Sequence, residues 1–144
     1  VLNQVYRQPN SRFANTISFY PWEKLYIQPE KSILPGDTGF YCSLTTANKY
    51  FCSSALFSFN TRSSDDEMSV DFKGVFIPFE CFTTPVELTT NKRKARWFVT
   101  GNLVQLNLNF NGVTYKGTIE RTGTSFKINW PDSSVIKISP LELK

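Results

Sequence analysis

Histidine is absent from the 144 residues of the chain. Its absence removes Ser-His-Asp and Cys-His activation of a nucleophile, the usual general base near neutral pH, and the commonest ligand of zinc and iron. Because there are only three cysteines, a cysteine-rich zinc site is excluded as well. We therefore expect a protein that is not an enzyme, with no cofactor and no metal site.

Long apolar runs and glycosylation sequons are also absent. No run approaches the roughly 20 apolar residues that a membrane-spanning helix needs. No Asn-X-Ser/Thr sequon occurs, which favours a bacterial envelope or virus-associated product over a eukaryotic glycoprotein. The chain begins at Val1, as expected after removal of a signal peptide or excision of a domain.

The residues that are present favour one folded domain over positions 1–144. Apolar residues make up 40% of the chain, and Phe accounts for 13 residues, enough for a sizeable core. Sixteen Lys and Arg against twelve Asp and Glu give a net charge of +4. This excess is mild, and it favours a partner with an acidic or polar surface.

The cysteines are Cys42, Cys52 and Cys81. A hairpin turning at 46–48 would place Cys42 opposite Cys52, within the Cβ separation that a disulfide requires. The spacing thus predicts a 42–52 bridge and an oxidising compartment. Bridges 42–81 or 52–81, or three reduced thiols, are the alternatives. With the 42–52 bridge formed, Cys81 is expected to be a buried free thiol.

Residues 95–139 are predicted to form a five-stranded antiparallel meander. Its turns would be Gly101-Asn102, Asn111-Gly112 and Thr122-Gly123, and its last strand would span roughly 135–139. Two-residue loops fix three registers: Trp97–Leu106 and Val99–Val104; Val104–Ile119, Leu106–Gly117, Leu108–Tyr115 and Phe110–Val113; Ile119–Phe126, Gly117–Ile128 and Tyr115–Trp130. These registers agree with one another, because every apolar residue in them falls on the same face.

Residues 1–90 are predicted to hold shorter, less regular strands, including the Cys42–Cys52 hairpin. The apolar alternation changes parity at Gly74, which indicates a β-bulge. No segment shows a helical period. An all-β sheet of about nine or ten strands must curl into a barrel or fold into a β-sandwich. The sequential hairpins favour an up-and-down barrel, lipocalin-like in outline, although the chain carries no family motif.

The polar face of the meander is the candidate partner-binding site. Amides, hydroxyls and cations alternate with the apolar set and suit a glycan or an acidic or polar protein surface. The predicted site residues are Arg96, Phe98, Gln105, Asn107, Asn109, Lys116, Lys127 and Asn129. The alternative is an ordinary solvent-facing sheet, for which such residues are common choices. Phe98 favours the functional interpretation, since an aromatic ring on a polar face is best covered by a partner.

A second candidate is the basic segment Lys92, Arg93 and Lys94, next to Arg96 and Phe98. Cations beside aromatic rings are typical of single-stranded nucleic-acid binders with OB-like folds. The predicted register turns the neighbouring tryptophan into the core, so a solvated hairpin tip is the simpler interpretation.

Two further segments carry weaker hypotheses. The acidic run 65–67 suits a solvated loop or a Ca²⁺ ligand set, but no EF-hand spacing surrounds it. An aromatic segment interrupted by Pro21 suits either a protein or sugar contact or packing beneath the barrel. Its aromatic residues are Phe13, Phe19, Tyr20, Trp22 and Tyr26.

The sequence therefore predicts a non-enzymatic binding module that acts outside the cytoplasm. It would be periplasmic, secreted or virus-associated, and it would recognise a protein or glycan as an adhesion, inhibitor or immunity protein does. The alternatives are an OB-like nucleic-acid-binding domain and a β-barrel that holds a small ligand.

Overall fold

The described part of the chain contains twelve strands and no helix. The structure is a computed structural model, and it describes residues 14–32, 39–52, 54–78, 84–89, 95–131 and 133–144. The strands are β1 (Ala14–Ile17), β2 (Leu25–Lys31), β3 (Gly39–Tyr50), β4 (Leu56–Ser63), β5 (Glu67–Pro78), β6 (Val86–Thr89), β7 (Ala95–Phe98), β8 (Leu103–Phe110), β9 (Val113–Thr122), β10 (Ser125–Asn129), β11 (Ile136–Ile138) and β12 (Glu142–Leu143). The predicted all-β class is confirmed.

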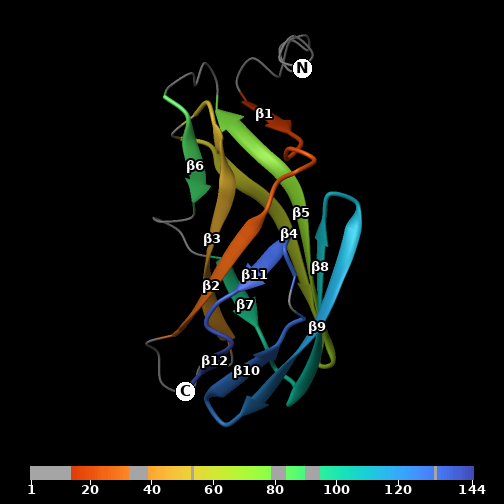
Figure 1. The fold of residues 1–144 in the computed structure, drawn as a ribbon. Helices are drawn as coiled ribbons and strands as arrows, with labels where there is room; N and C mark the ends of the chain where they lie inside the picture. Colours follow the sequence, from red (N-terminus) through yellow and green to blue (C-terminus); the bar gives the residue numbers. More distant parts are fainter. Residues whose placement is uncertain (1–13, 33–38, 53, 79–83, 90–94, 132) are drawn as a thin grey trace.

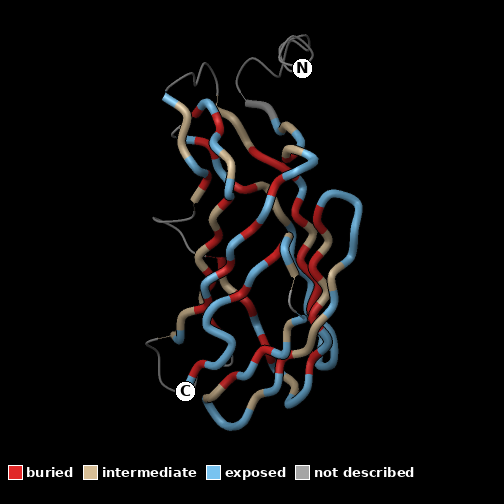
Figure 2. The backbone as a smooth tube through the Cα atoms, in the orientation of Figure 1, coloured by how far each residue is buried: buried red, intermediate tan, exposed pale blue. Residues whose placement is uncertain are grey.

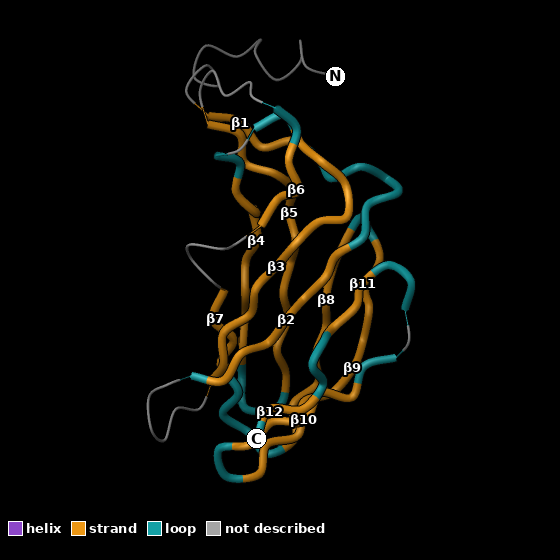
Figure 3. The backbone as a smooth tube through the Cα atoms, turned by 60° about the vertical axis from the view of Figure 1, so that its left-hand side comes forward, coloured by secondary structure: helices purple, strands orange, loops and turns teal. Residues whose placement is uncertain are grey.

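These strands form two sheets (Figure 1). Sheet A has seven strands in the order β1-β5-β8-β9-β10-β12, with β4 paired to β5. Sheet B has five strands in the order β11-β2-β3-β6, with β7 paired to β3. Sheet A is a curled half-barrel and sheet B is open. In the rotated view, β2 and β3 pass in front of β5 and β8 (Figure 3). Closure into a barrel is not confirmed.

The hydrophobic core lies between the two sheets and takes side chains from both. Buried and exposed positions alternate along β2 and β3, so one face of sheet B points inward (Figure 2). Phe40 of sheet B contacts Phe126 of sheet A, with ring centroids 5.1 Å apart. Trp97 is fully buried, as predicted. The same alternation turns the other face of each sheet outward.

The hairpin between β8 and β9 has the predicted register. Val104 lies opposite Ile119 and Phe110 opposite Val113, and Asn111 and Gly112 both have positive φ, as a type I′ turn requires. The next hairpin differs from its prediction by two residues, because its loop is Gly123-Thr124 and not Thr122-Gly123. Phe126 therefore lies opposite Arg121 and not Ile119. A shift of two residues keeps each side chain on its predicted face.

The predicted hairpin at Gly101-Asn102 is wrong. β7 pairs with β3 in sheet B, whereas β8 lies in sheet A, so the chain crosses between sheets at this point. Gly101 lacks the positive φ of a type II′ turn. A Cβ atom there would lie 1.9 Å from the carbonyl oxygen of Asp65. Glycine is therefore needed for the close approach of another backbone segment, and not for a turn.

The five-stranded meander over 95–139 is consequently a three-stranded one, β8-β9-β10. Its expected last strand is β11, which pairs in parallel with β2 in sheet B, Ile136 opposite Leu25. The neighbour of β10 is β12, with Lys127 opposite Glu142. Because β11 and β7 were expected to continue a local meander, their non-local partners in sheet B were missed.

The predicted hairpin around Cys42 and Cys52 is also wrong. Residues 39–50 form one continuous strand, β3, which pairs with β2 from Phe40 to Thr46 and with β6 at Lys49 and Tyr50. Buried positions continue through Thr46, and this stretch has no Asn-Gly or Gly-rich pair to reverse the chain. Cys42 is a free, buried thiol, while Cys52 is disulfide-bonded, so the predicted 42–52 bridge does not form. Cys81 lies outside the described residues.

The bulge predicted at Gly74 is present. Ser58 lies opposite Gly74 and Phe59 opposite Phe72, so Lys73 is the additional residue on β5. Gly74 has φ of 153°, and a Cβ atom there would lie 2.1 Å from the carbonyl oxygen of Ile17. The bulge lets β5 pair with β4 along one edge, and with β1 and β8 along the other.

Candidate functional site: two outward faces

The eight predicted site residues are divided between two sheets. Arg96 and Phe98 lie on β7 in sheet B, and the other six lie on β8, β9 and β10 in sheet A. The predicted pairing of Phe98 with Gln105 does not exist, because Phe98 lies opposite Gly39. The single expected face is therefore two faces, which point away from the shared core in opposite directions.

The outward face of sheet A is an amide grid that extends from β4 to β10. It contains Asn60, Arg62, Glu67, Ser69, Asp71, Gln105, Asn107, Asn109, Thr114, Lys116, Thr118, Glu120, Lys127 and Asn129. The six predicted residues of sheet A all belong to it. Cross-strand partners align its members into rows, as in Arg62–Ser69–Asn107–Lys116.

Hydrogen bonds connect the side chains within the amide grid. The amide of Asn109 donates to Asp71, while the hydroxyl of Thr114 donates to Asn109 Oδ1 over 2.6 Å. Arg62 lies 3.7 Å from the second carboxylate oxygen of Asp71. Asn129 Nδ2 donates to Glu120 over 2.8 Å. Many polar groups of this face are thus already satisfied within the protein, which lowers their value for a ligand.

The amide grid is also not basic, contrary to expectation. Glu67 and Asp71 of β5 lie among its cations, and Glu120 lies directly opposite Lys127. β5 was not expected to border β8, because the two strands pair in parallel across a long sequence separation. Their carboxylates therefore could not be placed on this face from sequence.

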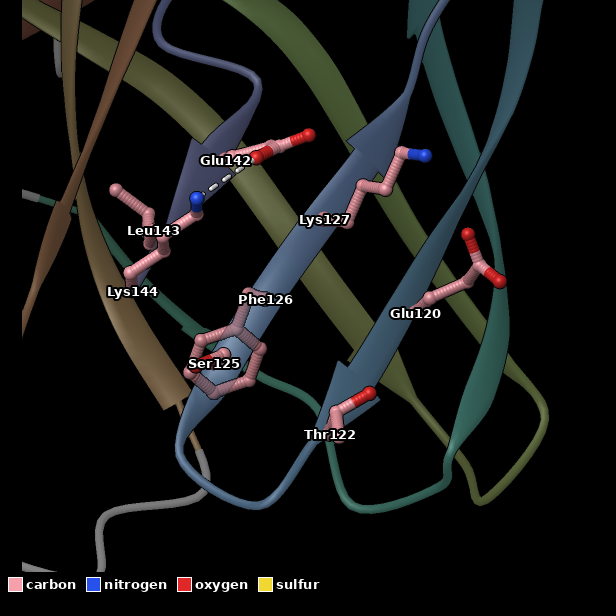
Figure 4. A pocket seen from close by; sticks show the side chains of 8 residues that line it. All are labelled: Glu120, Thr122, Ser125, Phe126, Lys127, Glu142, Leu143 and Lys144. Carbon is pink, nitrogen blue, oxygen red and sulfur yellow. Dashed lines mark ion pairs between the residues drawn. The ribbon is translucent and has the colours of Figure 1, made fainter.

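Two shallow depressions adjoin the lower part of the amide grid. One, of about 280 Å³, is lined by residues of β9, β10 and β12, including Glu120, Lys127 and Glu142 (Figure 4). The other, of about 440 Å³, also borders Lys127 and Glu142, and its lining includes Asn129 and Trp130. In Figure 4 the Lys127 side chain rises between the strands that carry the two glutamates. Open depressions of this kind would not enclose a small molecule as an enzyme or carrier pocket does.

The outward face of sheet B is both basic and aromatic. Cross-strand pairs place Lys137, Tyr26 and Thr45 in one row and Glu30, Tyr41 and Arg96 in another. We call these residues, with Gln28, Ser43 and Phe98, the basic–aromatic face. Phe98 is 48% exposed and Tyr26 is 43% exposed.

Arg96 is held between two aromatic rings on this face. Its guanidinium carbon lies 5.0 Å from the centroid of Tyr41 and 4.7 Å from that of Phe98. Gly39 lies beneath it, since a Cβ atom there would be 3.3 Å from an Arg96 guanidinium nitrogen. Such contacts contribute about 0.5–1 kcal/mol each at exposed sites. They fix the position of an otherwise flexible side chain.

Sequence reasoning missed the tyrosines of the basic–aromatic face. The sequence analysis places Tyr26 in the aromatic segment and assigns no role to Tyr41. The signal that could have found them is the alternation of Leu25, Ile27 and Pro29 with Tyr26 and Gln28, which predicts one outward face. Which strands share that face depends on pairings that the alternation does not encode.

The remaining predicted segments have structural roles where they are described. Asp65 accepts a hydrogen bond from Thr100 over 3.1 Å, and Asp66 accepts one from Ser64 over 3.0 Å. The acidic loop thereby supports the crossover from β7 to β8. Within the described ranges, no cluster of His, Cys, Asp or Glu could hold a metal ion. Lys92, Arg93 and Lys94 lie outside them.

Comparison with protein-family models, with curated proteins and with solved structures gives no match. Among the residues that the structure describes, no helix is long and apolar enough to cross a membrane.

Proposed function

We propose that the protein is a non-catalytic binding module that docks an acidic protein partner on the basic–aromatic face of sheet B. The observation that carries the proposal is the Arg96 side chain held between Tyr41 and Phe98 on a solvent-facing sheet. Arginine and aromatic residues dominate the binding energy of protein interfaces. Here they are fixed before binding, which reduces the entropy that association must spend.

Charge supports an acidic partner. Among the described residues, the outward positions of sheet B hold three cations, Lys49, Arg96 and Lys137. They hold two carboxylates, Glu30 and Glu87. The amide grid of sheet A, in contrast, mixes carboxylates evenly with cations. An acidic surface would therefore be attracted to sheet B in preference to sheet A.

A site of action outside the cytoplasm is part of the proposal. The disulfide at Cys52 supports it, because such bonds persist in oxidising compartments. The lack of histidine supports a non-catalytic role, as it removes the commonest acid–base group. Adhesion, inhibition and immunity are all compatible with a rigid scaffold whose partner binds to a sheet surface.

The test is capture of partners from the native source by immobilised protein and by the double variant Phe98→Ala, Tyr26→Ala. We expect the wild type to retain an acidic protein, with at least tenfold weaker binding by the variant, because each ring is a half-exposed apolar anchor. Affinity should fall as salt is raised from 50 to 500 mM.

The matched control is Leu103→Ala with Val113→Ala, which removes two apolar side chains of similar exposure from sheet A (60% and 49%). The control should bind as the wild type does. If Asn107→Ala with Lys116→Ala abolishes capture while the sheet B variant retains it, the amide grid is the docking surface and the proposal is wrong.

A further inference from the structure

A second surface lies at the turn that leads into β2, before the strand that carries Tyr26. The Glu23 amide donates to the carbonyl oxygen of Tyr20 over 3.0 Å, which closes a four-residue turn with Pro21 at its second position. Proline is favoured there, because its fixed φ matches the turn. The turn presents Trp22 to solvent, with 66% of its surface exposed. Pro21, which interrupts the aromatic segment of the sequence, thus lies in a turn.

Trp22 is the outermost of three stacked rings. Its ring lies parallel to that of Tyr20, with centroids 5.1 Å apart and planes 1° apart. The ring of Tyr20 in turn stacks on Tyr50, at 4.7 Å and 7°. Exposure falls along the column to 1% at Tyr50. Since one face of the Trp22 indole is covered by Tyr20, its exposed surface is largely the opposite face.

Hydrogen bonds fix the column from below and from the side. The hydroxyl of Tyr50 donates to buried Glu23 over 2.6 Å, and the hydroxyl of Tyr20 donates to the Lys49 carbonyl over 3.1 Å. Asn111, at the tip of the β8–β9 hairpin, donates to the Tyr20 carbonyl over 2.9 Å. The platform is therefore rigid before any ligand arrives, and binding to it costs little conformational entropy.

We propose that the exposed face of Trp22 is a stacking subsite for a carbohydrate ring. The face of an indole is electron-rich and attracts groups with a positive edge, such as the C–H bonds of a pyranose. One isolated ring has about the area of one sugar. Two polar residues border the turn, Asn111 through its bond to the Tyr20 carbonyl and Lys24 directly after Glu23, and such side chains suit sugar hydroxyl groups.

Charge separates this ligand from a cationic one, which would also favour an aromatic face. The carboxylate bonded to the column is that of Glu23, which is buried and accepts hydrogen bonds from Tyr50 and Asn48. Lys24 and Lys49 are exposed and adjoin the column in the chain, and exposed Glu87 of β6 lies opposite Lys49. The turn that presents Trp22 therefore offers a bound cation no exposed carboxylate, because Glu23 is buried, whereas a sugar needs none.

The experiment measures binding of the full chain to an array of neutral and acidic saccharides, followed by calorimetry with the best-bound one. Trp22→Ala should weaken binding at least tenfold, and Trp22→Phe, which retains a stacking ring, less than fivefold. Saccharide should shift the Trp22 indole NMR resonance but not that of Trp97, which is fully buried.

Leu103→Ala, at a similarly exposed apolar residue on sheet A, is the control and should bind normally. Phe98→Ala with Tyr26→Ala should also retain the saccharide, so the two proposals can fail separately. The inference is overturned if no saccharide on the array binds, if Trp22→Ala binds as tightly as the wild type, or if tetramethylammonium binds in place of saccharides.

Discussion

Glu23 is a carboxylate that the fold buries without a cation beside it among the described contacts. Its exposed fraction is 2%, and four donors satisfy it: the backbone amides of Lys24 and Asn48, the side-chain amide of Asn48 and the hydroxyl of Tyr50. These bonds join the start of β2 to the end of β3. The sequence would place a glutamate beside a turn on the surface, because three of its four donors belong to residues 25 and 27 positions away.

The Tyr50 hydroxyl gives this cluster a pH dependence. Burial, and then the hydrogen bond to Glu23, raise the pKa of Tyr50 well above its usual value of about 10. The folded state therefore holds this proton more tightly than the unfolded state does. The contribution of this difference to the unfolding free energy is fully present below pH 10. It is lost progressively as the pH rises above that value.

Tyr50→Phe should accordingly destabilise the protein by about 1–3 kcal/mol at pH 7, because a buried carboxylate loses a hydrogen bond. It should also flatten the decline of unfolding free energy between pH 10 and 11. Urea denaturation at pH 7, 10 and 11 measures both effects, with exposed Tyr26→Phe as the control. An equally steep alkaline decline in the variant would contradict the assignment.

At the scale of elements, the Asn-Gly turn and the alternation of inward and outward side chains were predicted correctly, whereas the other turns and the non-local pairings were not. Asn111-Gly112 specifies its own hairpin, because positive φ at two successive residues leaves few alternatives. Gly101-Asn102 also looks like a turn in the sequence. There, however, glycine is required because the backbone of Asp65, in the acidic loop, passes close to it. The alternation of apolar and polar residues correctly predicted which side chains of β8, β9 and β10 point outward. It could not show that β7, with Arg96 and Phe98, pairs with β3.

Gly101→Ala tests this distinction. The new methyl group would meet the Asp65 carbonyl oxygen at 1.9 Å, so either β8 or the acidic loop must shift. We expect a loss of about 1–3 kcal/mol in unfolding free energy, typical of overpacking. Asn102→Ala, at an exposed neighbouring position, should change it by less than about 0.5 kcal/mol. Equal stability of Gly101→Ala and the wild type in denaturant titrations would show that no close approach exists.

At the scale of the whole molecule, the two sheets share one core and turn different surfaces outward. The amide grid is neutral and internally hydrogen-bonded, the basic–aromatic face carries fixed cationic and aromatic groups, and the Trp22 column ends at the turn between them. A partner on one sheet cannot contact the outward face of the other. The surfaces can therefore be altered independently, which is why each double variant has a control on the opposite sheet.

The covalent connection across this scaffold is the last testable feature. Cys42 is buried and free, and burial, followed by the nearby charge of Glu30, raises the pKa of its thiol. Cys52 is disulfide-bonded, and Cys81 is the one other cysteine in the sequence. We therefore expect peptide mapping to find a 52–81 bridge, with one titratable thiol per chain in denaturant and almost none in the native state.

A bridge of this span closes a loop of roughly 30 residues, so its removal by Cys52→Ser should cost about 3–4 kcal/mol of unfolding free energy. Cys42→Ala leaves the bridge intact and removes only a small buried side chain, so it should cost about 1 kcal/mol. Three thiols in denaturant without reductant, or a mapped 42–52 bridge, would contradict this connectivity. Three thiols would also remove the support that the disulfide gives to an oxidising compartment, because no bridge would then be present.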